Sequence, residues 1–179
     1  MTALIIMGSS RENSYTAALS RTIADALLSV GVESDILNAG EWSAPSGRTP
    51  AGIAAELRER VAAADAVVLV SPVYHGGYSA LLKGLLDLLP GDAFADKPVA
   101  VAANGSGPRT GTVVCEQLRT VARALGAWIV PTQAASCPDD FVPEGALTAS
   151  ASAELRERCR AMAAELQRLS VLFRAPAGV

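Results

Sequence analysis

The fold is decided first by the stretch ALIIMGSS, residues 3–10. Its apolar residues run without a break into a glycine and two serines, which is typical of a buried strand that meets a loop. Residues 14–30 then carry apolar side chains at helical spacing, and Gly31 is the residue type that commonly ends a helix. The opening of the chain therefore predicts a strand, a short polar loop and a helix.

The same alternation of strand-like and helical segments continues along the chain. Further strands are expected at residues 32–37, 66–70, 99–103 and 127–130, and further helices at residues 53–64, 79–89, 110–125 and 155–169. Residues 38–50 contain glycines and prolines, and residues 137–143 contain prolines, which are typical of loops. This pattern predicts one α/β domain over residues 1–179, with a five-stranded parallel sheet and helices on both faces.

The composition narrows the possible partners. The 179 residues carry 15 basic and 18 acidic side chains, a net charge of −3, and the basic residues are scattered. This argues against a nucleic-acid partner, which requires a concentrated basic surface. The longest apolar runs, such as residues 66–70, fall far short of the roughly 20 residues of a membrane-spanning helix. The amino-terminal stretch also lacks the basic region of a signal peptide.

Cysteine and histidine are too sparse to predict a disulfide framework or a metal site. Cys115, Cys137 and Cys159 are widely spaced and form no C-x-x-C motif, and His75 is the one histidine of the chain. We expect reduced thiols in a cytoplasmic protein, placed as small core or surface residues.

The first expected loop reads GSSRENS, residues 8–14, and opens a helix. Free N–H groups and the dipole at a helix N-terminus favour an anion, and Arg11 adds a planar cation suited to phosphate oxygens. Ser9, Ser14 and Thr16 supply hydroxyl donors. The spacing matches neither the triphosphate-binding nor the dinucleotide-binding glycine motif, so a monophosphate is favoured. The alternative is an ordinary turn with Ser14 as the helix N-cap.

The second expected loop reads SPVYHGGYS, residues 71–79. Pro72 is expected to end the central strand, and Gly76 and Gly77 allow the backbone to approach a ligand closely. Two tyrosines beside this backbone are placed to flank a flat ring. The alternative is a turn in which glycine makes the backbone flexible, with both tyrosines packed as surface aromatics.

The third expected loop reads NGSGP, residues 104–108. Its two glycines and its serine offer backbone N–H donors to the polar edge of a heterocycle. A plain loop explains the segment equally well when it is considered alone.

Together the three motifs resemble one known family. GSSRENS, SPVYHGGYSALLKGLLDLLP and KPVAVAANGSGP, in this order and spacing from Ala3 to about Pro131, resemble the NADPH-dependent FMN reductases of the flavodoxin-like superfamily. The similarity is greatest to the flavin reductases of two-component monooxygenase systems. The resemblance implies a flavodoxin-like three-layer sandwich and an NAD(P)H-dependent flavin oxidoreductase. Such an enzyme passes hydride through FMN to a small acceptor such as free flavin or a quinone.

The resemblance also implies roles for individual residues, and it assigns the hydride chemistry to the flavin rather than to a catalytic side chain. The FMN phosphate would be held by Ser9, Arg11, Asn13, Ser14 and Thr16. The ribityl chain and one side of the isoalloxazine would lie along Pro72, Val73, Tyr74, His75, Gly76 and Gly77. The pyrimidine edge of the ring would meet Asn104, Gly105 and Ser106.

The chain departs from the family pattern in each of the last two loops. Many relatives have an acidic or polar residue in place of Val73 and an asparagine in place of His75, and the third loop is not a plain pair of glycines. A general acid role for His75 is disfavoured, because the flavin itself accepts and donates hydride. A position at the rim of the site or at a subunit contact is preferred.

Partners and rival functions follow from the same resemblance. A homodimer or homotetramer is expected, with a flavin-dependent monooxygenase as a further partner. The leucine-rich helix at residues 79–89 and the apolar seam of the last helix either serve such contacts or pack on the sheet. One rival function is a non-enzymatic flavodoxin-type electron carrier, against which the small net charge argues. The others are a flavin-dependent tailoring or redox-partner protein whose reductase activity is incidental, and a phosphate-binding hydrolase without flavin. The choice between NADPH and NADH rests on the resemblance.

Overall fold

The computed structural model describes residues 1–43, 49–144 and 148–174. Its elements are β1 (Thr2–Met7), α1 (Tyr15–Ser29), β2 (Glu33–Asn38), α2 (Ala39–Ser43), α3 (Pro50–Ala63), β3 (Ala66–Tyr74), β4 (Gly77–Tyr78), α4 (Ala80–Leu86), β5 (Pro98–Asn104), α5 (Thr110–Ala124), β6 (Trp128–Ile129), β7 (Ala134–Ser136), β8 (Phe141–Glu144), β9 (Thr148–Ala151) and α6 (Ala153–Arg174). No helix within these ranges is both long and apolar enough to span a bilayer.

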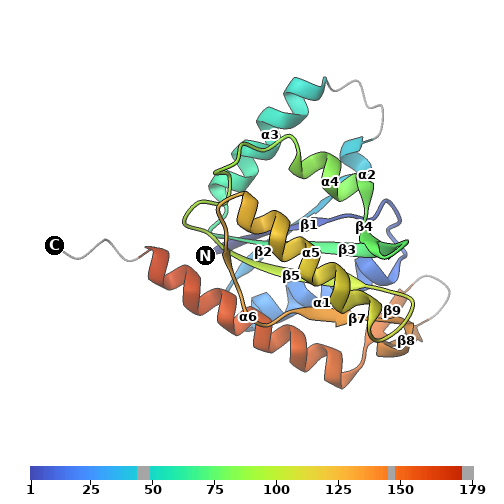
Figure 1. Ribbon diagram of the computed structural model, residues 1–179. Helices are drawn as coiled ribbons and strands as arrows, with labels where there is room; N and C mark the ends of the chain where they lie inside the picture. Colours follow the sequence, from blue (N-terminus) through green and yellow to red (C-terminus); the bar gives the residue numbers. More distant parts are fainter. Residues whose placement is uncertain (44–48, 145–147, 175–179) are drawn as a thin grey trace.

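The main strands form a parallel sheet in the order β2-β1-β3-β5-β6 (Figure 1). When these five strands are counted along the chain, the order is 2-1-3-4-5, which is the flavodoxin-like order of a doubly wound sheet. Helices α1 and α6 pack on one face, and α3, α4 and α5 pack on the other. The predicted α/β sandwich with helices on both faces is therefore confirmed.

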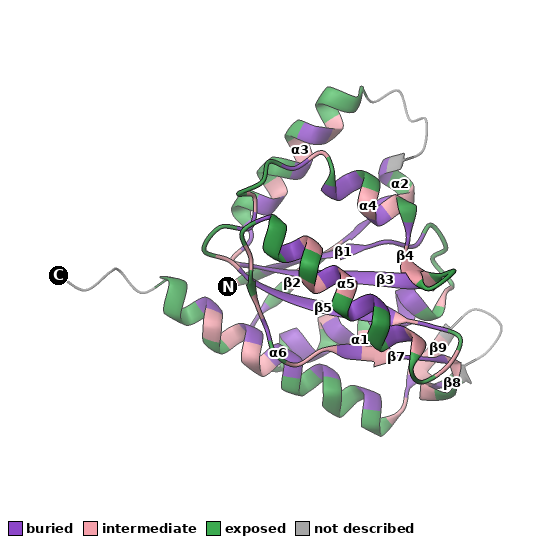
Figure 2. Ribbon diagram, in the orientation of Figure 1, coloured by how far each residue is buried: buried purple, intermediate pink, exposed green. Residues whose placement is uncertain are grey.

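Each face of the sheet has its own aliphatic core. In β1, Ile5 belongs to the core under α1 and α6, whereas Leu4 and Ile6 belong to the core on the opposite face. Side chains alternate between the faces of a strand, and helices cover both faces, so β1 is apolar at every position from Ala3 to Met7. Figure 2 shows the central strands buried and the outer sides of the helices exposed.

The central strand β3 continues past Pro72, which was expected to end it. Pro72 still pairs with Asn104 of β5, whereas β1 has already ended opposite Val70, where Gly8 N donates to the Val70 carbonyl. The polar backbone groups of every second residue point to the same side of a strand, so residue 72 faces the side that β1 has left. The missing N–H of the proline therefore costs the sheet no hydrogen bond.

Two expected loops contain regular structure, and the fifth strand is divided. The segment expected to be a loop at residues 38–50 begins with α2, whose Trp42 is buried in the core. The strand expected at residues 127–130 is shorter, and after Pro131 the chain returns to β5 as β7. The segment expected to be a loop at residues 137–143 contains a 3₁₀ turn and β8, which pairs with β9.

The two ends of the described chain meet at Asp65, directly before β3. Its carboxylate accepts hydrogen bonds from Thr2 N at 2.7 Å and from the Arg174 guanidinium at 2.5 and 2.7 Å. Burial acts to raise the pKa of Asp65, but these hydrogen bonds outweigh it and hold the pKa below its ordinary value. This junction lies at the edge of the sheet where the strands begin.

All three cysteines are free and buried, and we expect two of them to be unreactive in the folded protein. Burial raises the pKa of the Cys115 and Cys159 thiols to about 12 each, so the reactive thiolate is scarce at neutral pH. In a Cys137→Ser variant, a disulfide reagent at pH 8 should label no thiol until denaturant is added. Stoichiometric labelling of the folded variant would contradict this.

Candidate functional site

Three loops meet where the parallel strands end. Met7 of β1 pairs with Val70 of β3, and Pro72 of β3 pairs with Asn104 of β5, so the segments that follow these strands lie at one edge of the sheet. The chain winds outward in opposite directions from β1 and β3, and ligands of such folds bind in the crevice at this reversal.

The loop after β1 is folded around two hydroxyl groups. The Oγ atoms of Ser9 and Ser14 lie 3.1 Å apart, and Ser9 Oγ accepts a hydrogen bond from Arg11 N at 3.2 Å. Ser14 Oγ donates to the Arg11 carbonyl at 2.9 Å and accepts from Ala17 N at 3.1 Å. Ser14 is thus the N-cap of α1, as the alternative reading of this loop required.

The N-cap role leaves several donors for an anion. Among the described residues, none accepts a hydrogen bond from the backbone N–H groups of Tyr15 and Thr16, the first two residues of α1. The Arg11 side chain is exposed and forms no ion pair with a described residue, and Asn13 is exposed beside it. Two free amides at the positive end of a 15-residue helix, with a free guanidinium nearby, fit a single phosphate group.

Close packing fixes the backbone of this first loop. A Cβ atom on Gly8 would lie 2.5 Å from Ser79 Oγ and 2.8 Å from Leu82 Cβ, both at the start of α4. A Cβ atom on Gly40 of α2 would lie 2.4 Å from the Cα atom of Ser10. The two glycines therefore let α4 and α2, which pack in the same core, both approach this loop closely.

The second predicted loop is a β-hairpin formed by β3 and β4. Its two turn residues, His75 and Gly76, have φ values of 51° and 77°, the pattern of a type I′ turn. Gln117 of α5 donates a hydrogen bond to the Gly76 carbonyl at 3.0 Å and ties the tip of the hairpin to the body of the protein. Tyr74, beside the turn, is 54% exposed.

The turn geometry predicts the effect of changing His75. Asparagine occupies the left-handed region more readily than histidine, and Asn-Gly is a preferred type I′ pair. The variant His75→Asn should raise Tm by about 1–2 °C, because the left-handed conformation costs less. His75→Ala removes the same imidazole but should lower Tm, so thermal unfolding of both variants separates turn strain from lost contacts. Equal Tm values for the two variants would contradict the explanation.

The third loop uses most of its own polar groups internally. Gly105 N donates to the Ser136 carbonyl at 2.9 Å, and Gly107 N donates to Thr110 Oγ1 at 3.3 Å. The two glycine amides expected to face a heterocycle are therefore engaged within the protein, while Ser106 is exposed. Asn104 Nδ2 donates to Ser136 Oγ at 3.0 Å.

Sequence reasoning missed Ser136 and Gln117, which support the predicted site from outside the three motifs. Ser136 ends β7, a strand that was not expected, and Gln117 lies in the middle of α5. Neither position carries a local signal, because its role depends on the pairing of β7 with β5 or of α5 with the hairpin. The predicted residues themselves lie on the three segments at the strand ends.

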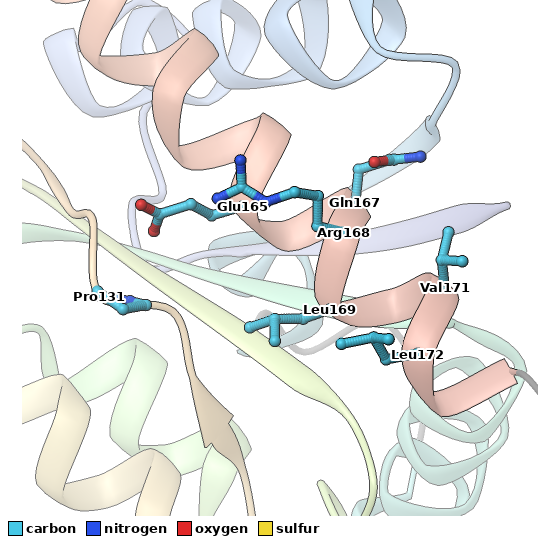
Figure 3. Close-up of a pocket in the computed structure, with 7 residues that line it drawn as sticks. All are labelled: Pro131, Glu165, Gln167, Arg168, Leu169, Val171 and Leu172. Atoms are coloured by element: carbon cyan, nitrogen blue, oxygen red, sulfur yellow. The ribbon is translucent and has the colours of Figure 1, made fainter.

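A groove of about 570 Å³ lies elsewhere, between α6 and Pro131. Figure 3 shows Glu165 and Leu169 extending from α6 toward the segment that carries Pro131. Its walls are mainly apolar and include Leu172. Because Pro131 follows a strand paired with the beginning of β5, this groove lies away from the edge where the three loops meet.

Comparison with known proteins identifies the family. The model of the NADPH-dependent FMN reductases matches residues 1–140, which include all three loops. The chain belongs to this family. The FMN-dependent NADPH-azoreductase of Staphylococcus aureus (strain NCTC 8325 / PS 47) is 37% identical over 150 residues, which cover 79% of this chain and 79% of the relative.

Solved structures of low sequence identity share the fold of this chain. An oxidoreductase from Corynebacterium diphtheriae superimposes with a TM-score of 0.74 at 22% identity, covering 96% of this chain and 97% of the other. The flavoenzyme NAD(P)H:(acceptor) oxidoreductase FerB from Paracoccus denitrificans gives a TM-score of 0.72 at 19% identity, covering 93% and 97%. Family membership confirms the predicted function: the chain is an NAD(P)H-dependent FMN oxidoreductase that uses FMN and NADPH.

Proposed function

We propose that FMN binds with its phosphate at the loop after β1 and its ring against the β3–β4 hairpin and the third loop. The observation that carries this placement is the donor set at the start of α1, where two amides and the Arg11 guanidinium are free for an anion. Ser9 and Ser14 shape the loop, and Asn13 lies at its rim. The bound FMN supplies the hydride chemistry between NADPH and the acceptor.

The side chains position the reactants rather than transfer a proton. The β3–β4 hairpin supplies a rigid wall, since its type I′ turn and the Gln117 bond restrict its movement. Val73 and Gly77 pair with Tyr78 and Tyr74 in this hairpin, and the exposed Tyr74 ring offers a flat apolar surface beside the site. A flat acceptor stacks well against such a surface.

For the acceptor, we propose an electron-poor aromatic compound of the azo or quinone class, with free flavin as the second candidate. Support comes from the named activity of the 37% identical relative and from the open, aromatic edge of the hairpin. Steady-state NADPH oxidation with FMN and each acceptor class tests this. Reduction of free flavin alone would favour the supply of reduced flavin to a monooxygenase and would reject the azo and quinone proposal.

The phosphate placement is tested by comparing FMN with riboflavin, which lacks the phosphate. Arg11→Ala should weaken FMN binding about 10- to 100-fold, as expected for a lost charge-assisted hydrogen bond, and should leave riboflavin binding unchanged. Arg123→Ala, at the far end of α5, is the matched control and should bind both as the unmodified protein does. Equal losses for FMN and riboflavin, or no loss, would contradict the placement.

A second copy of the chain is the proposed stable partner. The apolar seam of α6 and the leucines of α4 pack inside the chain: Leu82, Leu86, Leu155 and Leu166 are all buried in the two cores. The exposed apolar group formed by Trp128, Val171, Leu172 and Phe173 is therefore the better candidate for a contact between copies. It includes a Trp128–Phe173 ring pair at 5.5 Å and continues into the groove beside Pro131.

The proposed association of two or more copies is tested by measuring the mass of the particle in solution. Light scattering should give a homodimer or homotetramer that Leu172→Glu dissociates, and a dimer insensitive to this change would contradict the contact surface.

A flavin-dependent monooxygenase remains a proposed transient partner. Three unpaired cysteines support a cytoplasmic location, where thiols stay reduced.

A further inference from the structure

Ser136 joins the end of β7 to the third loop by two hydrogen bonds. Its Oγ lies 3.0 Å from Asn104 Nδ2, and its carbonyl accepts from Gly105 N at 2.9 Å. Ser136 is 3% exposed, and Asn104 and Ser136 are direct neighbours in the β5–β7 pairing. The buried Ser136 thus holds the side chain of Asn104 and the backbone of Gly105, the first two residues of this loop.

This arrangement determines what the third loop can offer to a ligand. The Asn104 amide nitrogen is engaged by Ser136, while Asn104 Oδ1 accepts no hydrogen bond from a described residue. The Gly105 and Gly107 amides are engaged within the protein. The loop therefore presents one free acceptor here, the side-chain oxygen Oδ1 of the partly buried Asn104.

The pyrimidine edge of an isoalloxazine carries one N–H donor, at N3, between two carbonyl oxygens. A fixed acceptor is the complement of this donor, whereas a freely rotating amide would also present its own donors. We propose that Ser136 is a positioning residue that holds Asn104 with Oδ1 available to the flavin N3–H. The proposal rests on the placement of FMN given above and adds a residue that acts through Asn104.

Holding the amide in one rotamer before the ligand arrives removes an ordering cost from binding. The close fit of the loop adds to this effect, because a Cβ atom on Gly105 would lie 1.9 Å from Thr110 Oγ1 and 2.8 Å from Thr110 Cβ. Thr110 Oγ1 also donates to the Gly107 carbonyl at 2.8 Å. The loop is thus fixed at both ends, by Ser136 and by Thr110.

The test compares FMN with 3-methyl-FMN, in which a methyl group replaces the N3 hydrogen. Dissociation constants by flavin fluorescence should show the unmodified protein binding FMN about tenfold more tightly than the analogue. Ser136→Ala should bind FMN about five- to tenfold more weakly and lose most of this preference. Ser170→Ala removes a buried serine hydroxyl that bonds Leu166 O on α6, and it should retain the full preference.

A double-mutant cycle separates positioning from a general structural effect. If Ser136 acts through Asn104, then adding Ser136→Ala to Asn104→Ala should cause little further loss of FMN affinity. Additive losses, a preference for FMN that survives Ser136→Ala, or no preference in the unmodified protein would overturn the positioning role. Failure of the unmodified protein to bind FMN, or binding that is insensitive to Arg11→Ala, would instead reject the underlying FMN placement.

Discussion

Replacing Gly8 with alanine is expected to lower the free energy of unfolding by about 2–3 kcal/mol, as overpacking of a tight contact does. The new Cβ atom would overlap Ser79 Oγ and Leu82 Cβ. Ser79 cannot easily turn away, because its Oγ caps α4 through Leu82 N at 3.1 Å and its own N–H donates to Ser71 Oγ at 2.9 Å. The strain must move either the start of α4 or the loop after β1.

The same variant should bind FMN more weakly, because the displaced loop carries the proposed phosphate donors. Gly84→Ala is the matched control: Gly84 lies in the middle of α4, and a Cβ atom there meets nothing within 4 Å. The control should gain about 0.5–1 kcal/mol from helix propensity. Denaturant unfolding and flavin titration of both variants measure the effects. An unchanged free energy of unfolding for Gly8→Ala would show that Ser79 and Leu82 can move aside without cost, which would contradict the prediction.

Removing the guanidinium of Arg119 should cost about 2–3 kcal/mol and lower Tm by about 5–10 °C. The guanidinium donates to the carbonyls of Val130 at 2.8 Å and Pro131 at 2.6 Å, and to Gln133 Oε1 at 3.1 and 3.2 Å. The side chain is 11% exposed. It satisfies the carbonyls that the divided fifth strand leaves without strand partners, so Arg119→Ala leaves these acceptors unsatisfied.

Arg119→Lys distinguishes charge from geometry, because lysine keeps the charge but lacks the planar set of donors. It should recover less than half of the lost stability. Arg123→Ala, one turn further along α5 and exposed, is the control and should change Tm little. If Arg119→Ala and Arg123→Ala have the same Tm, then the Arg119 guanidinium does not stabilise the divided fifth strand.

The sequence predicts best those elements whose neighbours reinforce the local pattern. Residues 3–7 and 66–70 form strands where continuous apolar runs indicate them, because helices cover both sides of the sheet. The prediction that Pro72 ends the strand was wrong, because a proline ends a strand only where a backbone N–H is needed for pairing at that position. That need depends on where the neighbouring strand stops.

The elements that were missed depend on contacts between distant segments. Helix α2 is short and is held by burial of Trp42 and by the contact of Gly40 with Ser10. Strand β7 consists of small residues with weak strand preference, and its pairing with β5 creates it. For the site, motifs located the three loops, but the internal use of the Gly105 amide by Ser136 could be recognised only in three dimensions.

The meeting of Thr2 and Arg174 at Asp65 has a practical consequence. A tether attached beside either residue would anchor the molecule by the side remote from the three loops, so the redox edge would face outward. An enzyme immobilised on an electrode or a bead in this way would keep its cofactor open to dissolved reactants.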